Sequence, residues 1–159
     1  MNIGVLKSVP QVLDHWHDED RSLQAHLAEV RQWMREVEQR GIPHFGETAT
    51  RLQALREKLE LHFSHQNQML HQISDLFLTP TPAIDSVRMQ ALYEHQQLLV
   101  ALDDLCARLS QLEPPFASWQ VAMKEVDEFF VGFEHHENRE SANIRTLTML
   151  ASQRDPELE

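Results

Sequence analysis

The prediction of the fold rests mainly on one segment, RLQALREKLELHFSHQNQMLHQI, residues 51–73. Alternating steps of three and four residues along it give a stripe that is apolar at both ends, which is typical of a helix with one buried face. Two polar residues interrupt this stripe at its middle. The segment therefore predicts a core helix with a polar break. The stripe consists of Leu52, Leu55, Leu59, His62, Gln66, Met69 and Ile73.

Turn-forming segments divide the rest of the chain in the same way. GIPHFG at 41–46, LTPTPAIDS at 78–86 and LEPPFAS at 112–118 are rich in proline and glycine and separate long helix-periodic segments. Short connections between long helices are typical of an up-down-up-down four-helix bundle. We predict an all-α single domain over residues 1–159. Its helices are expected at about 10–40, 47–77, 85–111 and 115–150.

Composition narrows the class of protein. The formal net charge is −11, which argues against a nucleic-acid-binding surface. The single cysteine, Cys106, allows no disulfide within the chain. No signal peptide and no apolar run long enough for a membrane span are evident. We therefore expect a soluble cytoplasmic protein without a membrane partner.

Histidine is the unusual component, at 10 of 159 residues. Each predicted helix places one histidine on its buried stripe. The turn between the first two helices is expected near residue 43 or 44, and His26 and His62 lie about 17 and 18 residues from it. Around the later turns, the distances of the paired residues from the turn agree within about one helical turn. All four are therefore expected in one layer near mid-bundle. They are His26, His62, His95 and His136.

Such a layer predicts a metal site. Several buried polar groups without partners cost a few kcal/mol each, and a metal ion removes that cost by ligating neutral imidazoles. His136 and Glu140 are four residues apart, so both reach the same point, and His62 and Gln66 share this spacing. Imidazole and carboxylate ligands suit iron, and zinc or manganese is compatible with them.

These residues carry a resemblance to a known family. LHFSHQ at 61–66, EHQQLLVALDDL at 94–105 and EHHENRE at 134–140, together with His26, resemble the hemerythrin-like (HHE cation-binding) domain over nearly the whole chain. The resemblance implies a diiron centre held by histidines and bridging carboxylates, which binds dioxygen or a related diatomic ligand or senses iron, redox or nitric oxide state. It matches the four histidines and Glu140 to family ligands.

The chain departs from the family pattern at two positions. Gln66 stands where the second helix is expected to carry a carboxylate, and Leu99 stands where oxygen-carrying hemerythrins have a further histidine. Gln66 is therefore expected as a weak ligand or as a hydrogen-bond partner of a ligand. The centre can be diiron, mononuclear or empty on this evidence. His135 is an alternative to His136, and His15 and His17 are alternatives to His26.

Other classes of function are less well supported. A ferritin-like diiron oxidase needs Glu-x-x-His on two helices, and none of the histidines has a glutamate three residues before it. No phosphate-binding loop or zinc-protease motif is present, so no catalytic residue is assigned and a non-enzymatic role is favoured. The alternative is a metal-free helical bundle that acts as an interaction or signalling module. The physiological ligand, the oligomeric state and any downstream partner are not indicated by the sequence.

Overall fold

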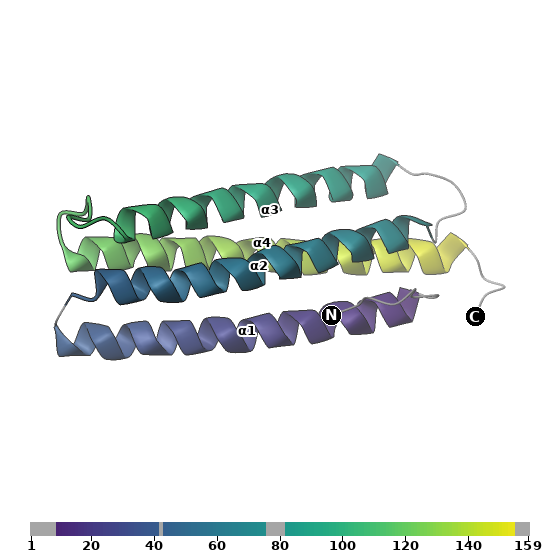
Figure 1. The fold of residues 1–159 in the computed structure, drawn as a ribbon. Coiled ribbons are helices and arrows are strands. Elements are labelled where there is room, and N and C mark those ends of the chain that lie inside the picture. The colour runs from purple at the N-terminus through teal and green to yellow at the C-terminus, as the bar shows by residue number, and fades with distance from the viewer. Residues whose placement is uncertain (1–8, 42, 76–81, 155–159) are drawn as a thin grey trace.

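The chain folds into four long α-helices (Figure 1). The computed structural model describes residues 9–41, 43–75 and 82–154, and these residues contain no β-strand. The prediction of an all-helical chain with four helices is thereby confirmed, although the predicted end of the second helix at residue 77 lies outside the described residues. The helices are α1 (Val9–Arg40), α2 (Phe45–Asp75), α3 (Pro82–Leu109) and α4 (Trp119–Arg154).

Local residues explain where the helices begin and end. Gly41 directly follows α1 and has a φ of 68°, a left-handed conformation in which glycine commonly ends a helix. α3 begins at Pro82, earlier than predicted, because the fixed φ of proline suits the first helical position. α4 begins at Trp119, later than predicted, because Ser118 caps it: Val121 N donates a hydrogen bond of 3.2 Å to Ser118 Oγ.

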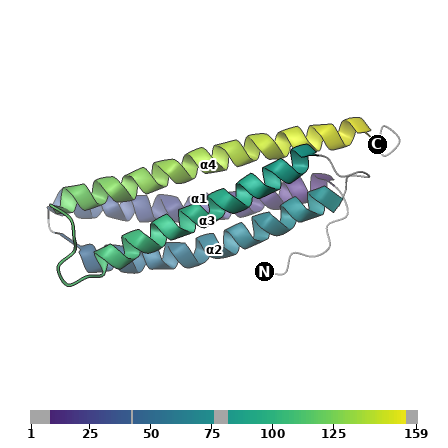
Figure 2. The same ribbon diagram turned by 90° about the horizontal axis from the view of Figure 1, so that it is seen from above.

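Side-chain contacts show which parts of neighbouring helices lie beside one another. His26 of α1 lies beside Lys58 of α2, and Glu19, farther back along α1, lies beside His65, farther along α2. α1 packs against α2 and α4, and α3 packs against the same two helices, so the four form a bundle (Figures 1 and 2). Side chains of the later neighbouring helices also meet, in the pairs Arg56–Asp103, His71–Arg88, Arg108–Glu125 and Glu94–Arg139.

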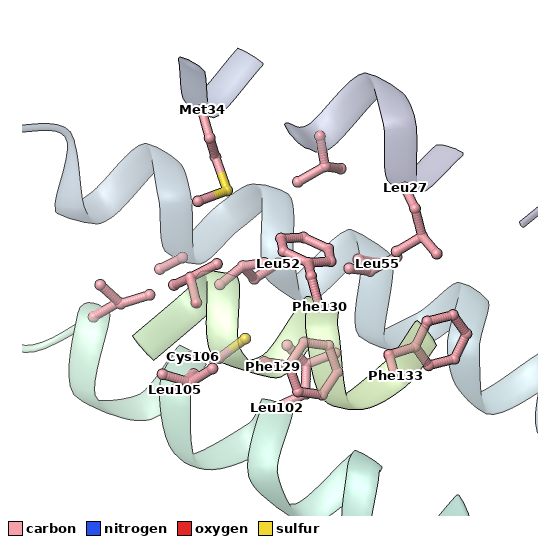
Figure 3. Close-up of a cluster of buried hydrophobic side chains, with 14 of the residues drawn as sticks. Leu27, Met34, Leu52, Leu55, Leu102, Leu105, Cys106, Phe129, Phe130 and Phe133 are labelled. Carbon is pink, nitrogen blue, oxygen red and sulfur yellow. The ribbon is translucent and has the colours of Figure 1, made fainter. Parts of the chain in front are cut away.

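The apolar core consists of two separate clusters. The larger cluster lies toward the connections α1–α2 and α3–α4 and is built from leucines, phenylalanines and Cys106 (Figure 3). The smaller cluster lies toward the other end and includes Trp16, Ile73 and Ile144. Each fully buried Leu, Ile or Phe stabilises the fold by about 1.5–3 kcal/mol, so these clusters supply the main driving force for folding. None of the described helices combines the length and apolar character that crossing a membrane requires.

A layer of buried polar side chains separates the two apolar clusters. All of its members are at most 6% exposed, as completely buried as the leucines on either side. Side chains of this kind are rarely buried unless they are paired or bind a metal. The layer contains His62, His65, Gln66, His95, His136, Glu137 and Glu140.

Candidate metal centre

Three of these buried side chains, from α3 and α4, converge on one point. His95, His136 and Glu140 are here called the first ligand group. His136 and Glu140 share a face of α4 because they are one helical turn apart. Glu140 Oε2 lies 2.8 Å from His136 Nε2, and Glu140 Oε1 lies 3.1 Å from His95 Nε2. One buried carboxylate therefore faces two buried imidazole nitrogens.

Each imidazole of the first ligand group is held from behind by an oxygen atom. His95 Nδ1 lies 2.9 Å from Asn67 Oδ1, and His136 Nδ1 lies 2.9 Å from Glu94 Oε2. A carboxylate oxygen and the amide oxygen are both acceptors, so each Nδ1 donates its hydrogen. This arrangement fixes both rings with Nε2 toward Glu140, which is how proteins commonly orient metal-ligating histidines.

The charge states of the first ligand group suit metal binding. Burial lowers the pKa of His95, against the opposing influence of Glu140, so this imidazole is neutral. Burial raises the pKa of Glu140, but the contacts with His136 and His95 outweigh it, so the net pKa is lowered and the carboxylate is ionised. Burial also lowers the pKa of His136, and Glu140 and Glu94 outweigh it, so the net pKa is raised. A metal ion would therefore compete with a proton more strongly at His136 than at His95.

A second set of ligand atoms lies beside the first. Asp20 of α1, His62 of α2 and Glu137 of α4 are here called the second ligand group. His62 Nε2 lies 3.7 Å from Asp20 Oδ1 and 3.5 Å from Glu137 Oε1. Burial lowers the pKa of His62, although Asp20 acts against this, and the ring is therefore in the neutral form that binds metals.

The two carboxyl groups of the second ligand group are crowded in the absence of a cation. Burial, with the adjacent Glu137, raises the pKa of Asp20 to about 8. Burial raises the pKa of Glu137 to about 7, and the charge of Glu140 acts in the same direction. A divalent cation at this position would favour the ionised form of both groups, as an opposite charge within a few ångströms does.

Glu137 connects the two ligand groups. Its Oε1 lies 3.5 Å from His62 Nε2 and 4.0 Å from His136 Nε2. Its side chain is 6% exposed. One carboxylate thus faces an imidazole from each group, which is the position that a ligand bridging two metal ions occupies.

Several buried polar atoms at this junction have no hydrogen-bond partner among the described residues. Such an atom costs about 1–3 kcal/mol when it is left unpaired. One of the atoms named below, His136 Nε2, nevertheless lies 2.8 Å from Glu140 Oε2. Unpaired nitrogen and oxygen atoms that face one point are the arrangement that a metal ion completes. The atoms are His62 Nε2, His136 Nε2, Gln66 Oε1 and Glu137 Oε1.

The structure brings together most of the residues expected from the sequence, but it leaves two outside. His62, His95, His136 and Glu140 belong to the ligand groups. Gln66 is buried beside them, with its Nε2 3.5 Å from Asp20 Oδ1, the place of a hydrogen-bond partner of a ligand. The expected ligand His26 belongs to neither group, and the alternative His135 is exposed on the outer side of α4.

A shift in the register of α1 against α2 explains the position of His26. Its Nδ1 lies 3.2 Å from Lys58 Nζ, and burial together with Lys58 lowers its pKa. The pairs His26–Lys58 and Glu19–His65 are both centred on residue 42, not on residue 43 or 44 as expected. This difference moves the partner of a given α2 residue by about one helical turn along α1. His26 therefore lies one turn too near the α1–α2 connection.

Two members of the second ligand group were missed by the sequence prediction. Asp20 adjoins Glu19, which the stripe on the first helix includes, and Glu137 adjoins His136. A stripe drawn in steps of three and four residues leaves out any residue directly next to one of its members. The available signal was the spacing itself: Glu137 lies three residues before Glu140, close enough along α4 for both carboxylates to reach one layer.

Comparison of the chain with models of protein families, with curated proteins and with solved structures gives no match. What characterises the chain is therefore its own structure: a helical bundle whose core holds two adjoining groups of histidine and carboxylate side chains that could hold a metal ion.

Proposed function

We propose that the chain is a metal-binding protein with a dinuclear centre inside a hemerythrin-like, up-down-up-down helical bundle. The observation that carries this proposal is the junction of the two ligand groups, where Glu137 Oε1 lies 3.5 Å from His62 Nε2 and 4.0 Å from His136 Nε2 and has no hydrogen-bond partner among the described residues. In the sequence, Gln66 stands where a carboxylate that bridges two metal ions is expected, which argued against a dinuclear centre. Glu137, on α4, would supply the bridging carboxylate that Gln66 cannot provide.

The donor set favours iron, with zinc and manganese as alternatives, because it consists of imidazole nitrogens and carboxylate oxygens without thiolates. His95, His136 and Glu140 would hold one ion, and Asp20 and His62 the other, with Glu137 between them. Bound iron would supply redox chemistry and an open coordination position for dioxygen or a related diatomic molecule. The resemblance to hemerythrin-like domains supports such a ligand, or the sensing of iron, redox or nitric oxide state.

The proposal is tested by elemental analysis of protein that is expressed with iron and purified without oxygen. We expect about two metal ions per chain, one for each ligand group. Removing them with a chelator is expected to lower the melting temperature, because ligands that bind only the folded state stabilise it.

Two adjacent histidines provide a matched pair of variants for this experiment. His136→Ala removes a buried ligand and is expected to abolish binding at the first ligand group, whereas His135→Ala alters an exposed side chain and is expected to keep the wild-type metal content. Protein without metal, or equal metal content in the two variants, would overturn the proposal and favour a metal-free bundle.

A further inference from the structure

The outer side of α3 differs from the rest of the molecular surface. Between residues 89 and 101 every exposed side chain of α3 is uncharged. A quarter of the whole chain is charged, so a run of this kind is unusual here. Its one acidic member, Glu94, is half-buried and turned toward His136 and Arg139. The surface, here called the neutral α3 face, consists of Met89, Gln90, Leu92, Tyr93, Gln96, Gln97, Val100 and Ala101.

Large apolar side chains project from this face. Met89 is 72% exposed, Tyr93 63%, Val100 60% and Leu92 49%. At about 100° per residue, these four lie within one side of the helix, so they form a single ridge. Exposed apolar ridges of this kind mark interaction sites, and methionine and tyrosine are enriched in protein interfaces. α3 is the helix nearest the viewer in Figure 2.

A groove lies directly beside the ridge, between α2 and α3. It has a volume of about 780 Å³, and Leu92, Leu99 and Val100 form its apolar wall. Its rim carries neutral amide groups, such as those of Gln68 and Gln96, and three charged side chains that pair with one another. The charged side chains are Arg56, Glu60 and Asp103. A smaller hollow of about 450 Å³ continues it across the ridge. Ridge and groove therefore share the same edge of α3.

This arrangement fits a second copy of the chain. The apolar wall of the groove is matched by a partner that presents an apolar ridge, and the neutral α3 face is such a ridge. Under a two-fold axis, the ridge of each copy enters the groove of the other, because a two-fold interface uses one surface twice. The two hollows are lined by 17 different residues. That number approaches the roughly 20–30 residues per side of a stable interface.

Charge also selects this partner over a basic one. Two copies, each with a net charge of −11, repel one another and approach most readily through surface that carries few unpaired charges. A basic partner would be matched by unpaired acidic side chains, but the neutral α3 face has no exposed acid, and Glu60 and Asp103 beside the groove pair with Arg56. We propose that the chain forms a two-fold symmetric homodimer through the neutral α3 face and the α2–α3 groove.

Sedimentation equilibrium over the micromolar range tests the proposal. The variant Met89→Glu/Val100→Glu places like charges in the interface, and we expect a loss of affinity of at least about 100-fold. The control Val131→Glu/Met149→Glu adds the same charge by replacing two exposed apolar residues of α4 and is expected to keep the wild-type affinity. Circular dichroism checks that both variants fold.

Salt dependence gives a second readout with a defined sign. Because the charged side chains beside the groove pair within one copy and the two copies repel, added salt screens the repulsion and is expected to strengthen the dimer. A wild-type chain that stays monomeric would overturn the proposal. It would indicate that the groove binds another kind of partner. A dimer that weakens with salt, or that the two double variants affect equally, also overturns the proposal.

Discussion

The two ligand groups differ in how their histidines are held. In the first group, Asn67 and Glu94 fix both imidazoles from behind, and Arg139 in turn donates a hydrogen bond of 2.6 Å to Glu94. In the second group, His62 Nδ1 has no partner among the described residues. Asp20, its neighbour in that group, has a side chain that is 19% exposed.

This difference indicates which free-energy costs oppose metal binding in each group. The first group has its ligands in place before a metal arrives, so little ordering entropy opposes binding. The second group must orient His62 and deprotonate two carboxyl groups when the metal binds. We therefore expect the first group to bind metal more tightly, and the second to depend more strongly on pH.

The largest expected effect that separates the groups is that of His62→Ala. This change removes the one imidazole of the second group, whereas all three members of the first group remain. We expect about one metal ion per chain in place of two, measured by elemental analysis after gel filtration. Two ions retained would show that His62 is not a ligand, and none would show that the groups bind metal only together.

Glu94→Gln is expected to have the next largest effect. The change keeps the shape of the side chain but weakens the hydrogen bond that holds His136, and such changes behind a ligand typically reduce metal affinity about 10–100-fold. Competition with a chromogenic chelator measures this affinity. Glu125→Gln is the control, because Glu125 also pairs with an arginine, Arg108, far from the ligand groups. Equal affinities in the two variants would contradict the role of Glu94.

A smaller effect concerns the pH dependence of the metal-free protein. The raised pKa values of Asp20, about 8, and Glu137, about 7, contribute stability that is present at low pH and lost as pH rises through these values. The lowered pKa values of His62 and His95 act oppositely, but only as pH falls below about 6.5. Between pH 6.5 and about 8.5 we therefore expect the free energy of unfolding to decline as pH rises.

Urea denaturation of the metal-free protein at several pH values measures this decline. Asp20→Asn removes one of the two titrating carboxyl groups and is expected to flatten the curve, whereas Asp18→Asn changes an exposed carboxylate and is expected to leave it unchanged. Metal affinity is expected to rise over the same interval, because binding releases protons. A metal-free stability that rises with pH in this window would be inconsistent with the buried carboxyl groups.

The fold was predictable because it rests on periodicity, which a single sequence displays. Leu52, Leu55 and Leu59 recur at helical spacing and are fully buried. Proline and glycine mark the connections between the helices. The helical rise of about 1.5 Å per residue also predicts how far along the bundle each side chain lies. For this reason His62, His95 and His136 could be predicted to lie in one layer.

The second ligand group was harder to predict because a stripe is narrower than the surface that a bundle helix buries. α4 packs against α3 on one side and α1 on the other, so two adjacent residues point inward. His136 is turned toward Glu94 of α3, and Glu137 toward Asp20 of α1. Adjacent residues are about 100° apart around a helix, which matches this division.

The register of α1 against α2 was the other source of error, and His26→Ala tests it with the smallest expected effect. Depth was counted from an assumed turn centre, and an error of one or two residues there moves a partner by about one turn. With its side chain 19% exposed and beside Lys58, His26 is expected to contribute nothing to metal content. Its removal is expected to change the free energy of unfolding by less than about 1 kcal/mol. A loss of metal comparable to that of His62→Ala would instead place His26 in the centre and show that α1 lies one turn farther along α2.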